Sequence, residues 1–167
     1  MGFKFLPDVR FLALFVLLGF VAAAADAQTA PTPSELAAYG GLHAAAVAGD
    51  SAAIRRLVSG GDNPNARDSH GRTPLMVAAH YRRHAAVRAL ISGGGDLNAL
   101  DFQRYDVLTI AAVLNDVTMV QLALDAGANA RAITSPYDGT ALIAATHLGH
   151  VQVVRALIKA RAPLDHV

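Results

Sequence analysis

The chain has 167 residues, of which 53% are hydrophobic, and its formal net charge is +1. This length suits one modest domain, and lysine and arginine are scattered rather than gathered into the basic face that nucleic-acid binding requires. Because the sequence contains no cysteine, it excludes disulfides and a lipid anchor of the bacterial lipoprotein type, which needs a cysteine at the cleavage point.

The N-terminal segment differs in composition from the rest of the chain. Two basic residues precede an unbroken apolar run of 15 residues, 11–25, which is followed by the small-residue sequence ADA. A membrane span needs about 20 apolar residues, so the pattern predicts a secretory signal peptide over 1–27. We expect cleavage between Ala27 and Gln28, with a cut after Ala25 as the second choice. An uncleaved N-terminal anchor is the alternative interpretation.

The alanine-rich signal favours bacterial export, and hence the periplasm, although secretion is also consistent with it. A cysteine-free chain tolerates an oxidising compartment without mispairing. We expect no stable membrane span after the signal is removed. Residues 28–35, QTAPTPSE, are polar and contain proline, which predicts a flexible linker without a fold of its own.

From residue 36 onward the sequence repeats itself. Four leucines, here called the key leucines, are 33, 33 and 34 residues apart: Leu42, Leu75, Leu108 and Leu142. A fixed period near 33 residues is typical of a stacked array of helix–turn–helix units. Positions within each unit are counted from its key leucine.

Each unit carries start and stop signals for two helices. Thr73, Asp106 and Thr140, at position −2, suit helix N-caps. Alanines at +3 and +4 allow neighbouring helices to approach closely. Position +7 is expected to end the first helix in a left-handed residue, and +19 to close the second. These positions hold Gly49, Arg82, Asn115 and Gly149, and then Gly61, Gly94, Gly127 and Arg161. Arg82 departs from the first pattern and predicts local strain or a changed turn.

The phrases LHAAA, GRTPLMVAAH and GTALIAATHLGH, together with the ending GDLNALD, resemble the ankyrin repeat family. The resemblance covers nearly all of the chain after residue 35 and implies an all-α solenoid of helix–turn–helix units with short connecting fingers. The third copy departs most, because DVL replaces TPL. The expected repeats span about 36–68, 69–101, 102–133 and 134–167. Stability should come from stacking of neighbouring units, and the last unit could also expose a surface for self-association.

Several stretches suggest chemistry, but each has a structural interpretation that we favour. Gly49-Asp50-Ser51 resembles an esterase nucleophile block, yet it falls on the predicted turn before a second helix. The glycine run 93–95 follows a predicted helix, whose C-terminal end repels phosphate. We therefore predict no enzyme and no cofactor.

Two histidine pairs have spacings that occur in metal sites, His80 with His84 and His147 with His150. In both pairs the predicted helix break lies between the two residues, so they need not converge on one ion. We expect structural roles for most of these side chains, and also for His43, and we predict no metal site. A metal-binding or enzymatic role for the histidines remains an alternative.

In the family that this chain resembles, protein partners bind the concave face, which comprises positions −6, −5, −3, +5 and +6. Transferred to this sequence, these positions predict a partner-binding face of His70, Arg72, His80, Tyr81, Phe102, Gln103, Tyr105, Val113, Leu114, Tyr137, His147 and Leu148. Aromatic residues and arginine are common anchors of protein interfaces. The alternative is that some of these side chains only pack along the fingers. Because histidines protonate near neutral pH, we also expect pH-sensitive binding through His70, His80 and His147.

The predicted function is that of a non-catalytic module that binds a protein partner in the periplasm. The partner is expected to be an enzyme that the module protects or helps to mature, or an envelope component. The alternative is a secreted effector that acts on a host protein.

Overall fold

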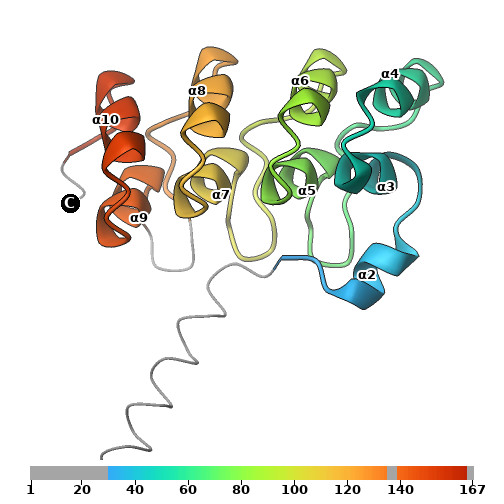
Figure 1. Ribbon diagram of the computed structural model, residues 1–167, viewed down its shortest axis with the longest axis horizontal. Helices are drawn as coiled ribbons and strands as arrows, with labels where there is room; N and C mark the ends of the chain where they lie inside the picture. The colour runs from blue at the N-terminus through green and yellow to red at the C-terminus, as the bar shows by residue number, and fades with distance from the viewer. Residues whose placement is uncertain (1–29, 135–138, 165–167) are drawn as a thin grey trace, which may run out of the picture.

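The computed structural model describes residues 30–134 and 139–164, and the predicted signal peptide lies outside these ranges. Within them the chain is helical, as predicted, with a short helix α2 (Pro33–Ala38) followed by four helix pairs (Figure 1). The pairs are α3 (Gly41–Ala48) with α4 (Ser51–Ser59), α5 (Pro74–His80) with α6 (His84–Ser92), α7 (Val107–Val113) with α8 (Val117–Asp125), and α9 (Ala141–His147) with α10 (Val151–Lys159). Among the described residues, no helix is long and apolar enough to cross a membrane.

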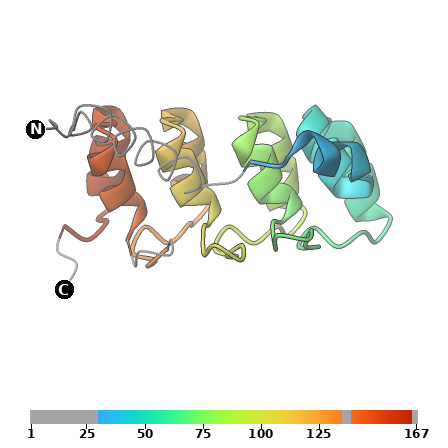
Figure 2. The ribbon, with the colours of Figure 1, turned by 90° about the horizontal axis from the view of Figure 1, so that it is seen from below.

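The helix pairs stack in a row of two layers. The first helices, α3, α5, α7 and α9, form one layer, and the second helices form the other (Figure 1). Seen from below, the connecting fingers lie along one edge of the row (Figure 2). The alanines at +3 and +4 are buried between successive first helices, except at position 146, where the residue is an exposed threonine. Small side chains therefore allow the helices to pack closely, and each pair buries its key leucine against its neighbours.

The predicted N-caps are confirmed. The side chains of Thr73, Asp106 and Thr140 each accept a hydrogen bond from the backbone N–H three residues later, at 3.3, 2.7 and 3.3 Å. The corresponding residue of the first pair, Gly40, has no side chain to do so. These caps satisfy amides that would otherwise lack a partner at the start of each buried helix.

The turns between paired helices also agree with the sequence pattern. All four residues at +7 have left-handed backbones, including Arg82 at φ 54° and Asn115 at φ 54°. The turn at Arg82 is therefore unchanged, contrary to one of the two alternatives that we considered. Arg161 similarly takes φ 60° at the position where the first three pairs have glycine. A left-handed backbone disfavours residues with a Cβ, so the strain lies at these arginines.

The fingers are held together by hydrogen bonds within and between units. The Asp68 carboxylate accepts from the amides of His70 and Arg72 at 2.8 and 2.9 Å. Asp101 repeats this arrangement one unit later, and the amide of Phe102 donates to the His70 carbonyl at 3.0 Å. Each finger is thus a fixed turn bonded to the next, which makes it a rigid support for surface side chains.

The prediction of a flexible linker over 28–35 is wrong for residues 33–35, which belong to α2. Thr32 caps this helix, and the Glu35 carboxylate accepts in return from the Thr32 backbone N–H at 2.7 Å. This reciprocal pair is a capping box, and it gives the segment a defined helical start. We call residues 31–39 the N-terminal arm.

Candidate partner-binding face

The N-terminal arm lies on the concave face of the first two helix pairs. In Figure 1, α2 lies on the side of α3 that faces away from α4. Pro31 is buried, and the Tyr81 hydroxyl, at the end of α5, is 3.5 Å from the Pro31 carbonyl oxygen. The arm therefore covers surface that the sequence assigned to an external partner.

Arg72 is at the centre of the contact between the arm and the second finger. Its side chain is 2% exposed, and its Nε donates to Asp68 Oδ2 at 2.6 Å. Its Nη2 forms an ion pair with Glu35 of the arm, and the Tyr39 hydroxyl donates to Asp68 Oδ2 at 2.6 Å. A buried guanidinium needs such partners, because an unpaired charge in the interior is very costly.

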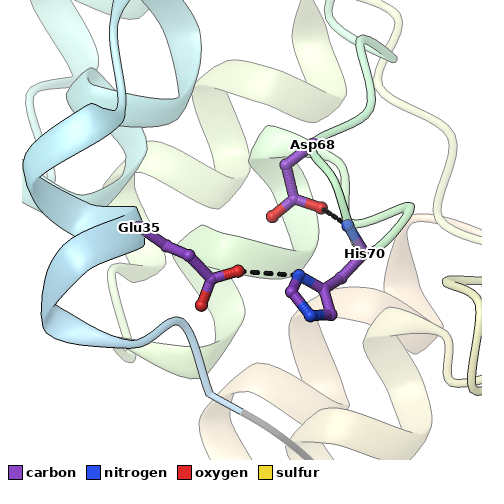
Figure 3. Close-up of side chains that lie close together, drawn as sticks. All are labelled: Glu35, Asp68 and His70. Carbon is purple, nitrogen blue, oxygen red and sulfur yellow. Dashed lines mark hydrogen bonds and ion pairs between the residues drawn. The ribbon is translucent and has the colours of Figure 1, made fainter.

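The exposed His70 also belongs to this cluster, and Figure 3 shows its ring beside Glu35 and its backbone nitrogen beside Asp68. Its Nδ1 lies 2.7 Å from Glu35 Oε1, and ligand atoms of Glu35, Asp68 and His70 all lie within 4.8 Å of one another. That grouping would suit a metal ion. However, Arg72 already binds both carboxylates, and it shares Oε1 of Glu35 with His70. A metal ion would have to displace the guanidinium, so the geometry favours an ion-pair cluster.

The cluster keeps its carboxylates charged. The hydrogen bond from the Thr32 backbone lowers the pKa of Glu35 to about 2, and the Thr32 hydroxyl and Arg72 act in the same direction. Burial alone would raise the pKa of Asp68, but hydrogen bonds from Tyr39 and Arg72 outweigh it and hold this pKa below its usual value. Burial and the bond to Asp68 raise the pKa of Tyr39, so the phenol remains protonated. The arm is consequently attached by charges that persist at neutral pH.

The concave face of the third and fourth pairs is different, because apolar side chains remain exposed there. Phe102 is 72% exposed and Leu148 is 52% exposed, while Val113 and Leu114 are half-buried and Leu114 packs against the core. Leu114 and Leu148 occupy position +6, as does Tyr81 in the second pair. These +6 side chains therefore form a row across successive first helices, from α5 to α9. The arm contacts this row at Tyr81.

The remaining predicted residues divide into three groups. His70 and His147 are exposed, and Gln103, His80 and Tyr81 are half-buried, so all five can reach the surface. Arg72 and Tyr105 are 1% and 4% exposed, so their assignment to a partner surface needs correction. Both lie at position −3, one residue before the buried N-cap of a first helix. Tyr137 lies outside the described residues.

Two family models match the chain. One, described as "Ankyrin repeats (3 copies)", matches residues 34–101, and another, "Ankyrin repeat", matches residues 137–167. Together they cover more than half of the sequence. The chain belongs to the ankyrin repeat family. None of the curated proteins compared with the chain matches it. Residues 102–136, between the two matches, contain the copy that the sequence analysis found least regular.

Ankyrin repeats are modules of protein–protein interaction and are typically non-catalytic, and three histidines of this chain have structural partners. Nε2 of His84 lies 2.8 Å from Asp116 Oδ2, and Nδ1 of His150 lies 2.9 Å from the Ala112 carbonyl. His43 similarly contacts the Arg72 carbonyl at 3.1 Å. The predicted structural roles are confirmed for these three. Their contacts join successive ankyrin repeats and direct each ring toward the neighbouring unit.

The other chemical motifs also have structural explanations. Asp50 accepts hydrogen bonds from two amides at the start of α4, and Gly49 is the left-handed turn residue before it. Gly94 likewise takes a left-handed backbone after α6. Both stretches are therefore helix boundaries, as the sequence analysis favoured.

The predicted pH sensitivity is wrong for His80. Burial, with a smaller effect of the positive charge on Arg72, lowers the pKa of His80 to about 4. The ring is consequently neutral between pH 5.5 and 8 and does not change charge in that range. The proposal of pH-sensitive binding now rests on His70 and His147, which are exposed.

A hollow of about 540 Å³ lies on the last ankyrin repeat, which is the unit predicted to expose a surface for self-association. Its lining is mainly apolar and includes Ile143 and Val154. Ile158 and Leu164, at 46% and 77% exposure, also line it. This end surface is a second place where another chain could bind.

Sequence reasoning missed the arm. Its signal was present, because TPSE at 32–35 has the spacing of a capping box, with threonine at the N-cap and glutamate three residues later. Proline within the same stretch supported the linker interpretation, although proline is also favourable in the first helical turn. The contact of Glu35 with Arg72 had no local signal, because 37 residues separate the two.

Proposed function

We propose that this ankyrin repeat protein binds a protein partner through the concave face of its third and fourth helix pairs, without catalysis. The observation that carries the proposal is the exposure of Phe102 and Leu148 on a face that the arm leaves open. Leu114, which packs against the core, and the half-buried Val113 add apolar area. The partner therefore binds a surface whose side chains are already positioned by the stacked helices.

The expected partner presents an apolar segment, since charge contributes little to this face. Large exposed apolar side chains on a soluble domain mark interaction sites when they lie together, and such anchors provide most of the binding energy at an interface. Arg82, which has a left-handed backbone, donates from its side chain to the Leu114 carbonyl and so ties the second repeat to this surface. Binding should consequently need little rearrangement of the repeats.

The proposed location is the periplasm, and the proposed role is to protect a periplasmic enzyme or to help it mature. The support for the location is the signal-peptide pattern of 1–27 and the absence of cysteine from the whole sequence. An envelope component is the other partner class consistent with this location. A secreted effector that binds a host protein would use the same concave face.

The test is capture of a partner by three versions of the chain without residues 1–27. The face variant carries Phe102→Asp and Leu148→Asp. The matched end variant carries Ile158→Asp and Leu164→Asp, which also replace two exposed apolar residues by acids. The proposal expects one protein from envelope extract to bind the parent and the end variant but not the face variant.

Two other outcomes would redirect the assignment. Loss of capture only in the end variant would move the site to the hollow of the last repeat. If none of the three retains a protein, host extract becomes the next source of partners, and metal content of the purified chain would test the alternative role of the histidines.

A further inference from the structure

The N-terminal arm is attached to the repeats by polar contacts and by two apolar side chains. Helix α2 contributes no buried residue, although Pro31, just before it, is buried, and the Tyr39 ring, just after it, packs against the core. The polar contacts join the Glu35 carboxylate to Arg72 and His70, and the Tyr39 hydroxyl to Asp68. Since α2 itself buries no residue, release of the arm should cost less free energy than unfolding a repeat.

The arm is joined to α3 through Gly40, the N-cap, and Gly41, the first residue of the helix. A Cβ added at Gly40 would meet no atom within 4 Å, and Gly41 has a left-handed backbone at φ 52°. Glycine permits many backbone conformations, so this junction allows the arm to swing away while α3 stays in the stack.

We propose that the N-terminal arm is a displaceable occupant of the concave face, and that an external acidic peptide segment competes with it for Arg72 and Tyr81. The proposal rests on the proposed binding role of the concave face and extends it from the open half to the covered half. The competing segment carries a carboxylate that replaces Glu35 and, four residues earlier, an apolar group that replaces Pro31. The arm itself defines this pattern, because Pro31 lies at Tyr81 while Glu35 lies at Arg72.

Displacement of the arm changes which groups of the concave face are accessible to a partner. With the arm in place, the Arg72 guanidinium is enclosed by two carboxylates and is inaccessible to solvent. Once Glu35 leaves, Arg72 keeps Asp68 as its partner and has a donor group available for an incoming carboxylate. The exchange replaces one charge-assisted hydrogen bond by another, so it needs only modest binding energy.

A labelled peptide with the sequence of residues 30–39, APTPSELAAY, tests the exchange directly. Its affinity is measured for the parent chain, for Glu35→Gln and for Asp125→Asn. Glutamine preserves the capping-box geometry but removes the charge that pairs with Arg72. Asp125→Asn makes the same acid-to-amide change at an exposed residue of α8. We expect the peptide to bind Glu35→Gln at least about fivefold more tightly than the parent or the control, because a weaker resident arm competes less.

The specificity of the exchange is tested with a second peptide in which the glutamate is replaced by glutamine. It should bind all three proteins at least about fivefold more weakly than the first peptide. Equal affinity of the two peptides, or equal affinity of the first peptide for Glu35→Gln and Asp125→Asn, would overturn the proposal.

Displacement can also be observed in the chain itself. Because the sequence has no cysteine, spin labels can be attached only at Ser34→Cys and Ser59→Cys, both exposed positions. The parent should give one narrow distance, which broadens when the first peptide is added in excess. An unchanged distance with the peptide bound would contradict the exchange. Neither experiment needs the natural partner, so they can fail while partner capture succeeds, and the reverse also holds.

Discussion

The two halves of the concave face have the same helical framework but present different surfaces. In the second ankyrin repeat, the N-terminal arm lies over the finger and its glutamate pairs with a buried arginine, Arg72. In the third repeat, Phe102 and the +6 leucine have no such cover among the described residues. The same repeat positions therefore give a charged, covered surface at one end and an apolar, open one at the other.

This difference shows that some repeat positions determine whether a side chain is available, while others do not. Position −3 holds Arg72 in the second repeat and Tyr105 in the third, and both are buried. At position +6, in contrast, Tyr81 contacts the arm while Leu148 is open to solvent. The N-terminal arm, which precedes the four helix pairs, thus changes the surface that the second pair presents.

The largest expected effect comes from breaking the cluster beneath the arm. Arg72→Met leaves Asp68 and Glu35 without their cation, and removal of one member of a buried ion pair typically costs about 3 kcal/mol or more. Urea denaturation should show this loss of unfolding free energy. The same substitution at exposed Arg88 should change it by less than about 0.5 kcal/mol. Equal effects at the two arginines would refute the importance of the cluster.

The contribution of an N-cap to stability can be tested in the third repeat, at Asp106. Asp106→Ala should destabilise the protein by about 1–2 kcal/mol, because the buried amide of Thr109 loses its acceptor. Asp106→Thr introduces the residue type that caps α5 and α9, so it should change the free energy of unfolding only slightly. Thermal unfolding of both variants measures the difference. A threonine variant as unstable as the alanine variant would contradict the capping role.

The same N-cap should also depend on pH. Burial raises the pKa of Asp106, although the bonds from Thr109 oppose the shift. A carboxyl whose pKa is raised by folding binds its proton more tightly in the folded state, so its contribution to stability falls as pH rises above the ordinary value of 3.8. Threonine has no such titration. The stability of Asp106→Thr relative to the parent should therefore increase from pH 3.8 upward, and a constant difference would argue against a raised pKa.

A smaller effect is expected at the end of the last repeat. Arg161 has a left-handed backbone at φ 60°, where the other repeats have glycine. Arg161→Gly should relieve this strain and stabilise the chain by about 0.5–1 kcal/mol. The gain at Arg82→Gly should be smaller, because that arginine also donates to the Leu114 carbonyl. A loss of stability at Arg161→Gly would show that its side chain makes a stabilising contact.

The smallest effect on global stability concerns the arm. Arg72 and His70 face Glu35, while Asp68 and the Tyr39 hydroxyl are the other titratable groups of the cluster. Because the pKa of Glu35 is lowered from 4.5 to about 2, its stabilisation is present above pH 4.5 and is lost as pH falls toward 2. Hydrogen exchange of arm amides should accelerate over this range in the parent. The exchange rates of the same amides in Glu35→Gln should not show this acceleration. Identical pH profiles of the two proteins would contradict the role of the Glu35 charge.

The fold could be predicted from the sequence because its determinants are local and repeated. Thr73 and Thr140 cap their helices as their position suggests, and Asn115 takes the turn conformation that its spacing indicates. The site was predicted less completely, because burial at Arg72 and Tyr105 depends on distant contacts. Glu35 reaches Arg72 across 37 residues, and no periodic pattern encodes that pairing.

The most direct test of the central claim is photo-crosslinking from single positions on the concave face and away from it. A photoreactive amino acid placed at Phe102 or Leu148 should crosslink one periplasmic protein, while the same group at Arg88 or Ile158 should not. That result would place the partner on the open half of the concave face. Crosslinks to the same protein from Ile158 alone, or from all four positions equally, would contradict the account.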